Sequence, residues 1–444
     1  MRVVIVGAGE VGSNAARMLS GEGHDVVLVE QDEALVGRMG QQLDAMVVRG
    51  NGATPRVLAE AGIEKSDLLV AATGSDEVNI TSCMAAKHQG VSRTVARLHN
   101  PEYHESGAPF AQEVLGIDFV IHTEQVAVQE IKASLLIPGA VDVESFAGGR
   151  VEVAEVILDE DSPAVGRAVR EVELPERSLV IGGVRDGEAL MYRGDTVLEA
   201  GDHVFLISER WNTAGVVGAV ATDTRPVREV MVYGGGRIGL GVAETLDEVD
   251  IAVKVIERDT ARAQYVASRL RRGSVIQGKD ISRELLLQEG VERVDAFIAV
   301  TGDDRANLLG AMYARQLGAR LTIAGLGRGE FAPLAGTLGI DITISPRLLA
   351  AGAISRFVRR GDVAAVTLLE SGAQMIELRV PRGCRIAGRP LSEVGVPKGA
   401  IVGMVLREGE VTVPTGKDAL NPGDEVVIFA VEGTVDQVER LFSS

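Results

Sequence analysis

The strongest constraint on the fold is a glycine-rich segment that occurs twice in the chain. The first copy reads VIVGAGEVG at 4–12, and the second reads MVYGGGRIG at 231–239. Each copy begins on an apolar, strand-like run, and each is followed by a glutamate, Glu30 or Glu257, that lies 23 residues after the first glycine (30 − 7 and 257 − 234). One such motif is a weak signal, but two complete copies predict two dinucleotide-binding folds in tandem.

Each glycine of this motif has its own task. The first allows a tight strand-to-helix turn, the second lets backbone N–H groups approach a pyrophosphate, and the third lets the helix pack closely on the strand. The phosphates lie at the positive N-terminus of that helix. The glutamate accepts hydrogen bonds from a ribose 2′-hydroxyl and would repel a 2′-phosphate, which favours NAD(H) or an adenosine nucleotide over NADP(H). The alternative is a fold that keeps the glycine turn but has lost its ligand.

Bulk composition narrows the class of protein. A chain of 444 residues exceeds one ordinary core, so several domains are expected. The content of 46% hydrophobic but only 3% aromatic residues indicates aliphatic α/β interiors. A net charge of −18 argues against nucleic acid as a partner, because phosphate binding needs a basic surface. It also argues against broad adsorption to anionic lipid.

The cysteines and the apolar runs indicate a cytoplasmic location. Cys83 and Cys384 lie far apart and fit neither a disulfide framework nor a metal motif. The sequence runs from Met1 directly into a strand without a signal-like leader. No stretch approaches the ~18 to 20 apolar residues of a membrane span. Any role at a membrane is therefore expected to depend on a partner.

The repeat extends well beyond the glycines and sets the domain map. The segment Thr-Gly-x-Asp-x-x-Asn occurs at 73–79 and again at 301–307, each time after an apolar strand. Apolar strands alternate with helical stretches in both copies, which predicts doubly wound parallel sheets. Each copy is followed by a tail rich in short β-branched runs, and the two tails match in GDHVFLI at 201–207 and GDEVVIF at 423–429.

We therefore predict an α/β protein with two Rossmann-like domains, each followed by a small α+β domain. The expected boundaries are residues 1–138 and 228–358 for the Rossmann-like domains, and 139–222 and 362–444 for the small domains.

This layout resembles the TrkA family, the cytosolic subunits of bacterial Trk potassium-uptake systems, which carry two tandem RCK (KTN) modules. The resemblance covers nearly the whole chain. It rests on the duplicated glycine motif, the duplicated Thr-Gly-x-Asp-x-x-Asn segment and the stretch ARLHNPEY at 96–103 taken together. It implies a peripheral subunit at the inner face of the cell membrane, a TrkH-type potassium-conducting partner and a homotetrameric ring. NAD(H), ATP and ADP are the ligands that it implies for the clefts.

Carried over residue by residue, the resemblance implies nucleotide contacts from both glycine loops, both acids and the ends of two further strands. These residues are Gly7, Ala8, Gly9, Glu10, Val11, Gly12, Glu30, Thr73, Gly74 and Arg97 in the first copy, and Gly234, Gly235, Gly236, Arg237, Ile238, Gly239 and Glu257 in the second. Arg97 aligns with Gly325, so we expect the second site to be weaker for a pyrophosphate. Asp76 and Asp304 are further candidates for sensing phosphate, directly or through a cation.

The residues favour ligand binding over catalysis. An oxidoreductase needs a proton donor or base near the nicotinamide, usually from a distinct catalytic domain, whereas each tail here has only about 80 residues and few histidines or cysteines. His99 and His104 flank a turn but lack a third metal ligand nearby. We therefore predict a non-enzymatic sensor without catalytic or metal-binding residues. An NAD-dependent oxidoreductase and a nucleotide-sensing regulator of another cation transporter stay open as alternatives.

Overall fold

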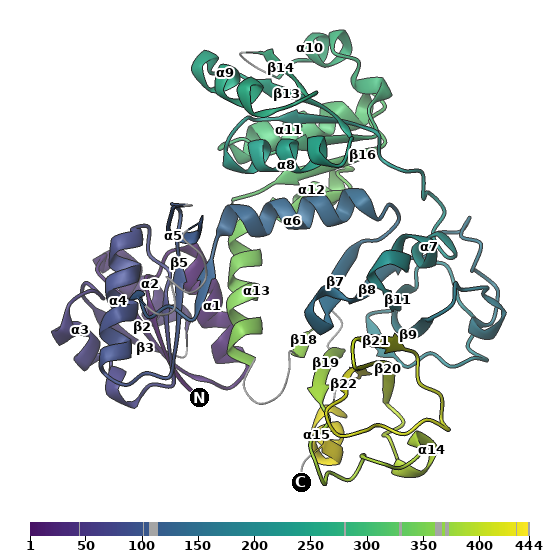
Figure 1. The fold of residues 1–444 in the computed structure, drawn as a ribbon. Helices are drawn as coiled ribbons and strands as arrows, with labels where there is room; N and C mark the ends of the chain where they lie inside the picture. Colours follow the sequence, from purple (N-terminus) through teal and green to yellow (C-terminus); the bar gives the residue numbers. More distant parts are fainter. Residues whose placement is uncertain are drawn as a thin grey trace. The chain divides into compact units, whose positions relative to one another are not determined.

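The computed structural model describes nine segments of the chain: 1–43, 45–100, 102–105, 114–278, 281–327, 331–359, 366–368, 373–431 and 433–442. The chain forms two compact units, and both halves of the sequence contribute to each of them. Residues 1–132 and 228–358 form the first unit, and residues 133–227 and 359–444 form the second. Figure 1 shows their helices and strands, with labels on many of them.

The first repeat of the first unit is built on a six-stranded parallel sheet with the order β3-β2-β1-β4-β5-β6. Its strands are β1 (Arg2–Val6), β2 (Asp25–Glu30), β3 (Met46–Arg49), β4 (Leu68–Ala71), β5 (Arg93–Arg97) and β6 (Phe119–Ile121). The strand order reverses between β1 and β4. In such sheets the carboxyl ends of the strands open a crevice at this switch point. The position of the ligand cleft thus follows from the topology.

Helices cover both faces of this sheet and explain its apolar strands. They are α1 (Glu10–Gly21), α2 (Glu33–Gln42), α3 (Pro55–Glu60), α4 (Asp76–His88) and the short α5 (Glu102–Glu105). Every residue of β4 is buried, as expected of a central strand covered on both sides. Side chains cap two of these helices: Asp32 accepts bonds from the first turn of α2, and Ser75 does so for α4.

The second repeat has the same strand order, β14-β13-β12-β15-β16-β17. Its strands are β12 (Glu229–Tyr233), β13 (Ala252–Glu257), β14 (Ser274–Gln277), β15 (Ala296–Ala299), β16 (Leu321–Gly325) and β17 (Ile342–Ile344). Its helices are α8 (Arg237–Glu248), α9 (Thr260–Arg269), α10 (Arg283–Gln288), α11 (Asp304–Gln316) and α12 (Ala332–Thr337). The prediction of two doubly wound parallel sheets is therefore confirmed.

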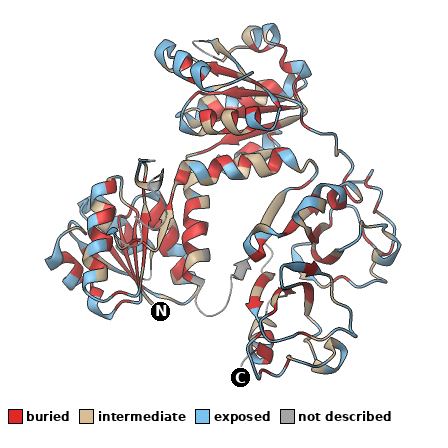
Figure 2. Cartoon of the chain, in the orientation of Figure 1, coloured by how far each residue is buried: buried red, intermediate tan, exposed pale blue. Residues whose placement is uncertain are grey.

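The two repeats exchange their last helices, α6 (Thr123–Leu136) and α13 (Pro346–Arg359). Helix α13 follows the second sheet but buries Ala351, Ile354 and Val358 in the core beneath the first sheet. Helix α6 follows the first sheet and approaches α8, where a Cβ on Gly241 would lie 2.9 Å from a methyl group of Val128. Figure 2 shows buried residues along both helices. Each repeat thus completes the packing of the other.

The second unit contains two five-stranded antiparallel sheets, ordered β10-β9-β11-β8-β7 and β18-β19-β22-β20-β21. The strands are β7 (Asp142–Phe146), β8 (Val151–Ile157), β9 (Ser178–Arg185), β10 (Glu188–Leu190), β11 (His203–Glu209), β18 (Val366–Leu368), β19 (Gln374–Arg379), β20 (Ala400–Arg407), β21 (Glu410–Thr412) and β22 (Glu425–Ala430). The helices are α7 (Thr213–Gly218), α14 (Leu391–Val394) and α15 (Val435–Phe442). The prediction of small α+β domains is confirmed.

Each sheet of the second unit contains the same arginine–aspartate pair. Arg185 donates to Asp202 through Nε and Nη2, at 2.7 Å each, and Arg407 makes the same paired bonds to Asp424 at 2.9 and 2.7 Å. Both aspartates are almost fully buried, so each charge is compensated by a fork of two hydrogen bonds. Among the described residues, no helix has the length and apolar character needed to cross a membrane.

Candidate functional site

A cleft of about 550 Å³ opens at the carboxyl ends of the first sheet's central strands. Eight of the ten residues that the sequence predicts for the first copy line it: Gly7, Gly9, Glu10, Val11, Glu30, Thr73, Gly74 and Arg97. The other two support the loop from behind. Ala8 is buried, and Gly12 lies in the first turn of α1. The volume falls within the range of pockets that hold small ligands and cofactors.

The geometry of the first loop requires glycine at positions 7 and 12 and leaves open space beside Gly9. Gly7 has φ +102°, a left-handed conformation that suits glycine. A Cβ on Gly12 would lie 1.9 Å from the carbonyl oxygen of Gly7, so only glycine lets α1 approach the loop. Gly9, the N-cap of α1, has φ −61° and ψ 179°, and a Cβ there would meet no protein atom within 4 Å. That free space is the open end of the cleft, next to the positive N-terminus of α1.

Glu30 fixes the glycine loop to the end of β2. Its Oε2 accepts a 2.6 Å hydrogen bond from the backbone N–H of Ala8, and its Oε1 accepts one of 2.9 Å from Asp32. Glu257 makes the corresponding 2.7 Å bond to the second glycine loop. The acid is therefore held at the rim of the cleft, at the position where this fold accepts bonds from a ribose.

Asn79 explains the Thr-Gly-x-Asp-x-x-Asn motif. It is fully buried, its Oδ1 accepts from the N–H of Thr73 at 2.9 Å, and its Nδ2 donates to the carbonyl of Arg97 at 2.7 Å. Asn307 makes the equivalent bond to the carbonyl of Gly325 at 2.7 Å. The asparagine thus ties the ends of two neighbouring strands together at the edge of the cleft. The duplicated motif was the sequence signal for it, although the predicted site set did not include it.

Asp76 and Asp304 secure the loops that follow β5 and β16. Asp76 accepts from the backbone N–H of His99 at 2.9 Å and of Asn100 at 2.8 Å, and its Oδ1 lies 2.8 Å from Nδ1 of His99. Burial alone would raise the pKa of Asp76, but these hydrogen bonds hold it below its usual range. Asp304 accepts from the N–H of Gly327 at 2.7 Å. Both carboxylates therefore have a structural task before any ligand binds.

Arg97 is the last residue of β5, and its side chain borders two cavities. It lines the first cleft and also a cavity of about 340 Å³ that extends between the two repeats. Its Nε donates to the hydroxyl of Thr123 at 3.0 Å, which orients the guanidinium. Burial lowers its pKa, the neighbouring Glu124 opposes that effect, and the positive charge of Arg347 adds to it. The guanidinium is thus partly desolvated, which strengthens any bond to an anion.

The first cleft is also lined by residues that the predicted set does not include, among them a turn, a serine and an arginine of the second repeat. The turn at 50–52 approaches β1 so closely that a Cβ on Gly52 would lie 2.2 Å from Val6, and Ser75 lines the cleft beside Thr73 and Gly74. The turn had a sequence signal, since VVRGNG has a counterpart in the second copy. Arg347 also lines the cleft but comes from the second repeat. No local pattern assigns a residue to a site that lies in the other repeat.

The second repeat reproduces the glycine loop. Gly234 has φ +107°, and a Cβ on Gly239 would lie 1.8 Å from the carbonyl oxygen of Gly234. The other predicted residues of this copy take equivalent places, with Gly235 bonded to Glu257, Gly236 as N-cap of α8, and Arg237 and Ile238 in its first turn. Ile238 and Gly325 line the 340 Å³ cavity. The end of β16 thus carries no guanidinium where β5 carries that of Arg97.

Charged side chains of both signs line the first cleft. The described residues that line it include two glutamates and two arginines, but none of them is a histidine, lysine, tyrosine or cysteine. Cys83 is buried, and desolvation raises its pKa far above the usual range of a thiol, so it is not a nucleophile at neutral pH. In the described part of the chain, no cluster of three or more histidine, cysteine or acidic residues is placed to hold a metal ion.

Comparison with known proteins agrees with the fold. The TrkA-N domain model matches residues 3–123 and 230–346, and the TrkA-C domain model matches 153–212 and 375–443. The chain is 35% identical to Trk system potassium uptake protein TrkA homolog 2 of Methanosarcina mazei, and the match covers all of both chains. It is 33% identical to the TrkA protein of Haemophilus influenzae, covering all of this chain and 98% of that one.

Solved structures share the architecture. The GsuK channel superposes with a TM-score of 0.65 at 18% identity, over 99% of this chain and 78% of that chain. The GsuK channel bound to NAD superposes with a TM-score of 0.63 at 18% identity, over the same shares of the two chains. At this identity the likeness concerns the fold alone. With both domain models matched twice and full-length relatives above 30% identity, the chain belongs to the TrkA family of Trk system potassium uptake proteins.

Proposed function

We propose that this chain is the nucleotide-sensing subunit of a Trk-type potassium uptake system. It acts from the cytoplasmic face of the membrane on a TrkH-type potassium-conducting protein, and NAD(H), ATP or ADP are its ligands. The observation that carries the proposal is the first cleft. There a glycine loop, a helix N-terminus, an acid at the ribose position and two arginines converge in a member of the TrkA family.

The proposed ligand contacts follow the chemistry of the cleft. The pyrophosphate lies over Gly9 at the N-terminus of α1, where N–H groups and the helix dipole favour negative charge. Glu30 accepts the ribose hydroxyls at the end of β2. Arg97 and the N–H groups around Thr73 and Gly74 complete the phosphate end. The second loop, Gly234 to Ile238 with Glu257, is proposed as a weaker site, since Gly325 replaces the arginine.

The protein acts as a sensor rather than an enzyme. Oxidoreductase chemistry needs a general acid or base near the nicotinamide, and the residues lining the cleft offer only glutamates that already have structural partners. A ligand shifts a conformational equilibrium only by its difference in affinity between the two states. Typical coupling energies are ~1 to 3 kcal/mol, enough for a clear effect on gating. A homotetrameric ring would let several clefts contribute to one change of shape.

The binding step is tested by calorimetric titration of the full chain with NADH, NAD, ATP and ADP, followed by chromatography of the recovered ligand. We expect saturable binding of an unchanged ligand. Conversion of the ligand by the purified protein, at a rate proportional to its concentration, would instead favour the oxidoreductase. Lack of binding by all four nucleotides would refute the proposed function of the cleft.

The gating step is tested with the membrane partner. Potassium flux into liposomes that contain the TrkH-type protein should change on addition of the subunit and should respond to nucleotide. A variant with a filled first cleft, such as Gly9→Val, should bind the partner but lose the response. Purification of the subunit with an antiporter or another cation transporter, and not with a TrkH-type protein, would point to the alternative partner.

A further inference from the structure

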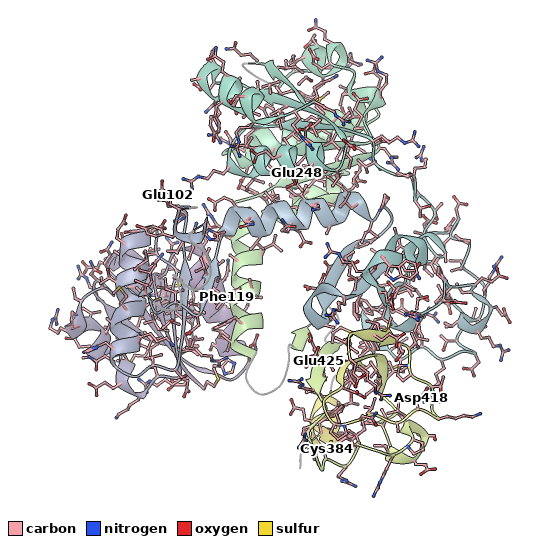
Figure 3. The ribbon with its side chains drawn as sticks, in the orientation of Figure 1. Glu102, Phe119, Glu248, Cys384, Asp418 and Glu425 are labelled. Carbon is pink, nitrogen blue, oxygen red and sulfur yellow. The ribbon has the colours of Figure 1, made fainter. Side chains whose placement is uncertain are left out.

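The exchanged helix α13 brings a residue of the second repeat to the first cleft. Its apolar face is part of the first repeat's core through Ala351, Ile354 and Val358. The ring of Phe357 stacks on Phe119 of the first sheet at a centroid distance of 4.9 Å, and Figure 3 shows Phe119 close to α13. Packing along about two helical turns fixes the axis of the helix, so its N-terminal residues have a defined place next to the cleft.

Arg347 is the second residue of α13 and lines both the first cleft and the 340 Å³ cavity. Its guanidinium forms an ion pair with Glu10 in the first turn of α1, and its Nη1 lies 3.4 Å from the carbonyl oxygen of Gly327. Both side chains of the ion pair are more than two-fifths exposed. An exposed pair of this kind adds little to stability and is easily rearranged.

The repeat shows that this ion pair is one of two related pairs with opposite polarity. Glu10 follows the second glycine of the first motif, and Arg237 follows that of the second motif. Glu124 is the second residue of α6, as Arg347 is of α13. Arg237 pairs with Glu124 at 3.5 Å, as Arg347 pairs with Glu10. In the first repeat, therefore, the loop supplies the carboxylate and the incoming helix supplies the cation.

This polarity has a consequence for a phosphate at the N-terminus of α1. Glu10 lies in that first turn, so a bound pyrophosphate would face a carboxylate of its own sign. Among the lining residues that the structure describes, Arg97 and Arg347 are the two cations. An arginine binds phosphate oxygens through its planar fork of donors as readily as a carboxylate. The phosphate and Glu10 thus compete for the same guanidinium.

We infer that Arg347 is a phosphate ligand supplied by the second repeat to the nucleotide in the first cleft, and that Glu10 holds it until the phosphate displaces the carboxylate. This inference rests on the proposed function of the cleft and adds its means of regulation. The charge of the ligand decides which partner Arg347 keeps. Because α13 carries Arg347, binding of a nucleotide in the first cleft changes the contacts of this helix at the junction between the repeats.

The test compares three single variants of the full chain by titration with ADP. Arg347→Gln removes the proposed ligand and should weaken binding about ten- to a hundredfold, the usual effect of losing a charge-assisted bond. Arg93→Gln is the matched control. Its guanidinium lies 5.7 Å from the ring centroid of Phe357 at the other end of α13, so the variant disturbs the same helix away from the cleft. It should bind ADP as the unsubstituted protein does.

The Glu10→Gln variant distinguishes two explanations of the ion pair, because they predict opposite changes in ADP affinity. If Glu10 competes with the phosphate, removing its charge should strengthen ADP binding by about three- to tenfold, the scale of one screened like-charge contact. If the ion pair merely clamps α13, the same change should weaken binding, as Arg347→Gln does.

Three results would overturn the inference: Arg347→Gln binding ADP as the unsubstituted protein does, Arg93→Gln losing as much affinity as Arg347→Gln, or Glu10→Gln binding more weakly. Absence of ADP and NADH binding by the unsubstituted protein would instead refute the proposed function of the cleft, and this inference with it.

Discussion

Gly9→Val should abolish nucleotide binding in the first cleft without unfolding the protein. A Cβ at Gly9 meets no protein atom within 4 Å, and the backbone there, φ −61° and ψ 179°, is open to any residue. Valine is a poorer N-cap than glycine, but it also restricts the unfolded chain. These opposing effects leave the free energy of unfolding within about 1 kcal/mol of the original value.

The effect on binding should be much larger. The isopropyl group occupies the space above the loop and keeps the pyrophosphate away from the N–H groups of α1. Loss of two charge-assisted bonds, each worth about 1.5 kcal/mol or more, weakens binding by about a hundredfold or more. Calorimetric titration with NADH and ADP measures this loss, and urea unfolding measures the stability. Potassium flux with the membrane partner should lose its nucleotide response in parallel.

Two neighbouring glycines provide the controls. A Cβ on Gly12 would lie 1.9 Å from the carbonyl oxygen of Gly7, so Gly12→Ala should destabilise the protein by about 1 to 3 kcal/mol. Gly21, the last residue of α1, has open space around it, so Gly21→Ala should leave both stability and ADP affinity nearly unchanged. Wild-type affinity in a folded Gly9→Val protein would show that the pyrophosphate does not lie over this loop.

Three further predictions concern buried polar and thiol groups. Asn79→Ala should lower the free energy of unfolding, measured in urea, by about 3 kcal/mol. It should also weaken ADP binding, because the carbonyl of Arg97 loses its hydrogen bond to the Asn79 side chain. Unchanged ADP affinity would show that Asn79 acts in folding alone. Cys83 should resist thiol reagents in the native protein and react on denaturation, because burial raises its pKa; rapid native labelling would contradict this. Burial would raise the pKa of Asp202, but bonds from Arg185 hold it below its unfolded value, so its stabilisation is present above about pH 4 and lost as pH falls further. Asp202→Asn should therefore cost about 3 kcal/mol at pH 7 and flatten the acid limb of a stability-against-pH curve; an unchanged limb would refute this.

The sheets could be predicted from the sequence because their signals are local. Each glycine motif, the strand before it and the glutamate after it lie within about 30 residues and specify one βαβ unit. The repeat then assigns the same fold to the second copy. The position of Glu30 at the end of β2 followed from that spacing.

The exchange of helices could not be predicted, because the hydrophobic pattern of a helix does not specify the sheet on which it packs. The apolar residues of α13, such as Ile354, show that the helix has a buried face, but they do not show which sheet covers it. In the sequence, nothing distinguishes Arg347 from a surface residue in the first turn of a helix. Its place beside Glu10 depends on a contact between residues 337 positions apart (347 − 10), which only the tertiary structure supplies.

The exchange of α6 and α13 also bears on how such a chain can evolve. In a symmetric dimer of identical subunits that exchanged these helices, every substitution would be present at both junctions. A glutamate in one glycine loop would therefore also be present in the other. Joining two copies in one gene removes that constraint and lets each half accumulate its own changes. The reversed polarity of Glu10–Arg347 and Arg237–Glu124 is such a divergence, since a strictly symmetric pair cannot encode it. Fusion of the two copies thus permits one half to specialise in binding nucleotides, while the other half can acquire a different ligand preference.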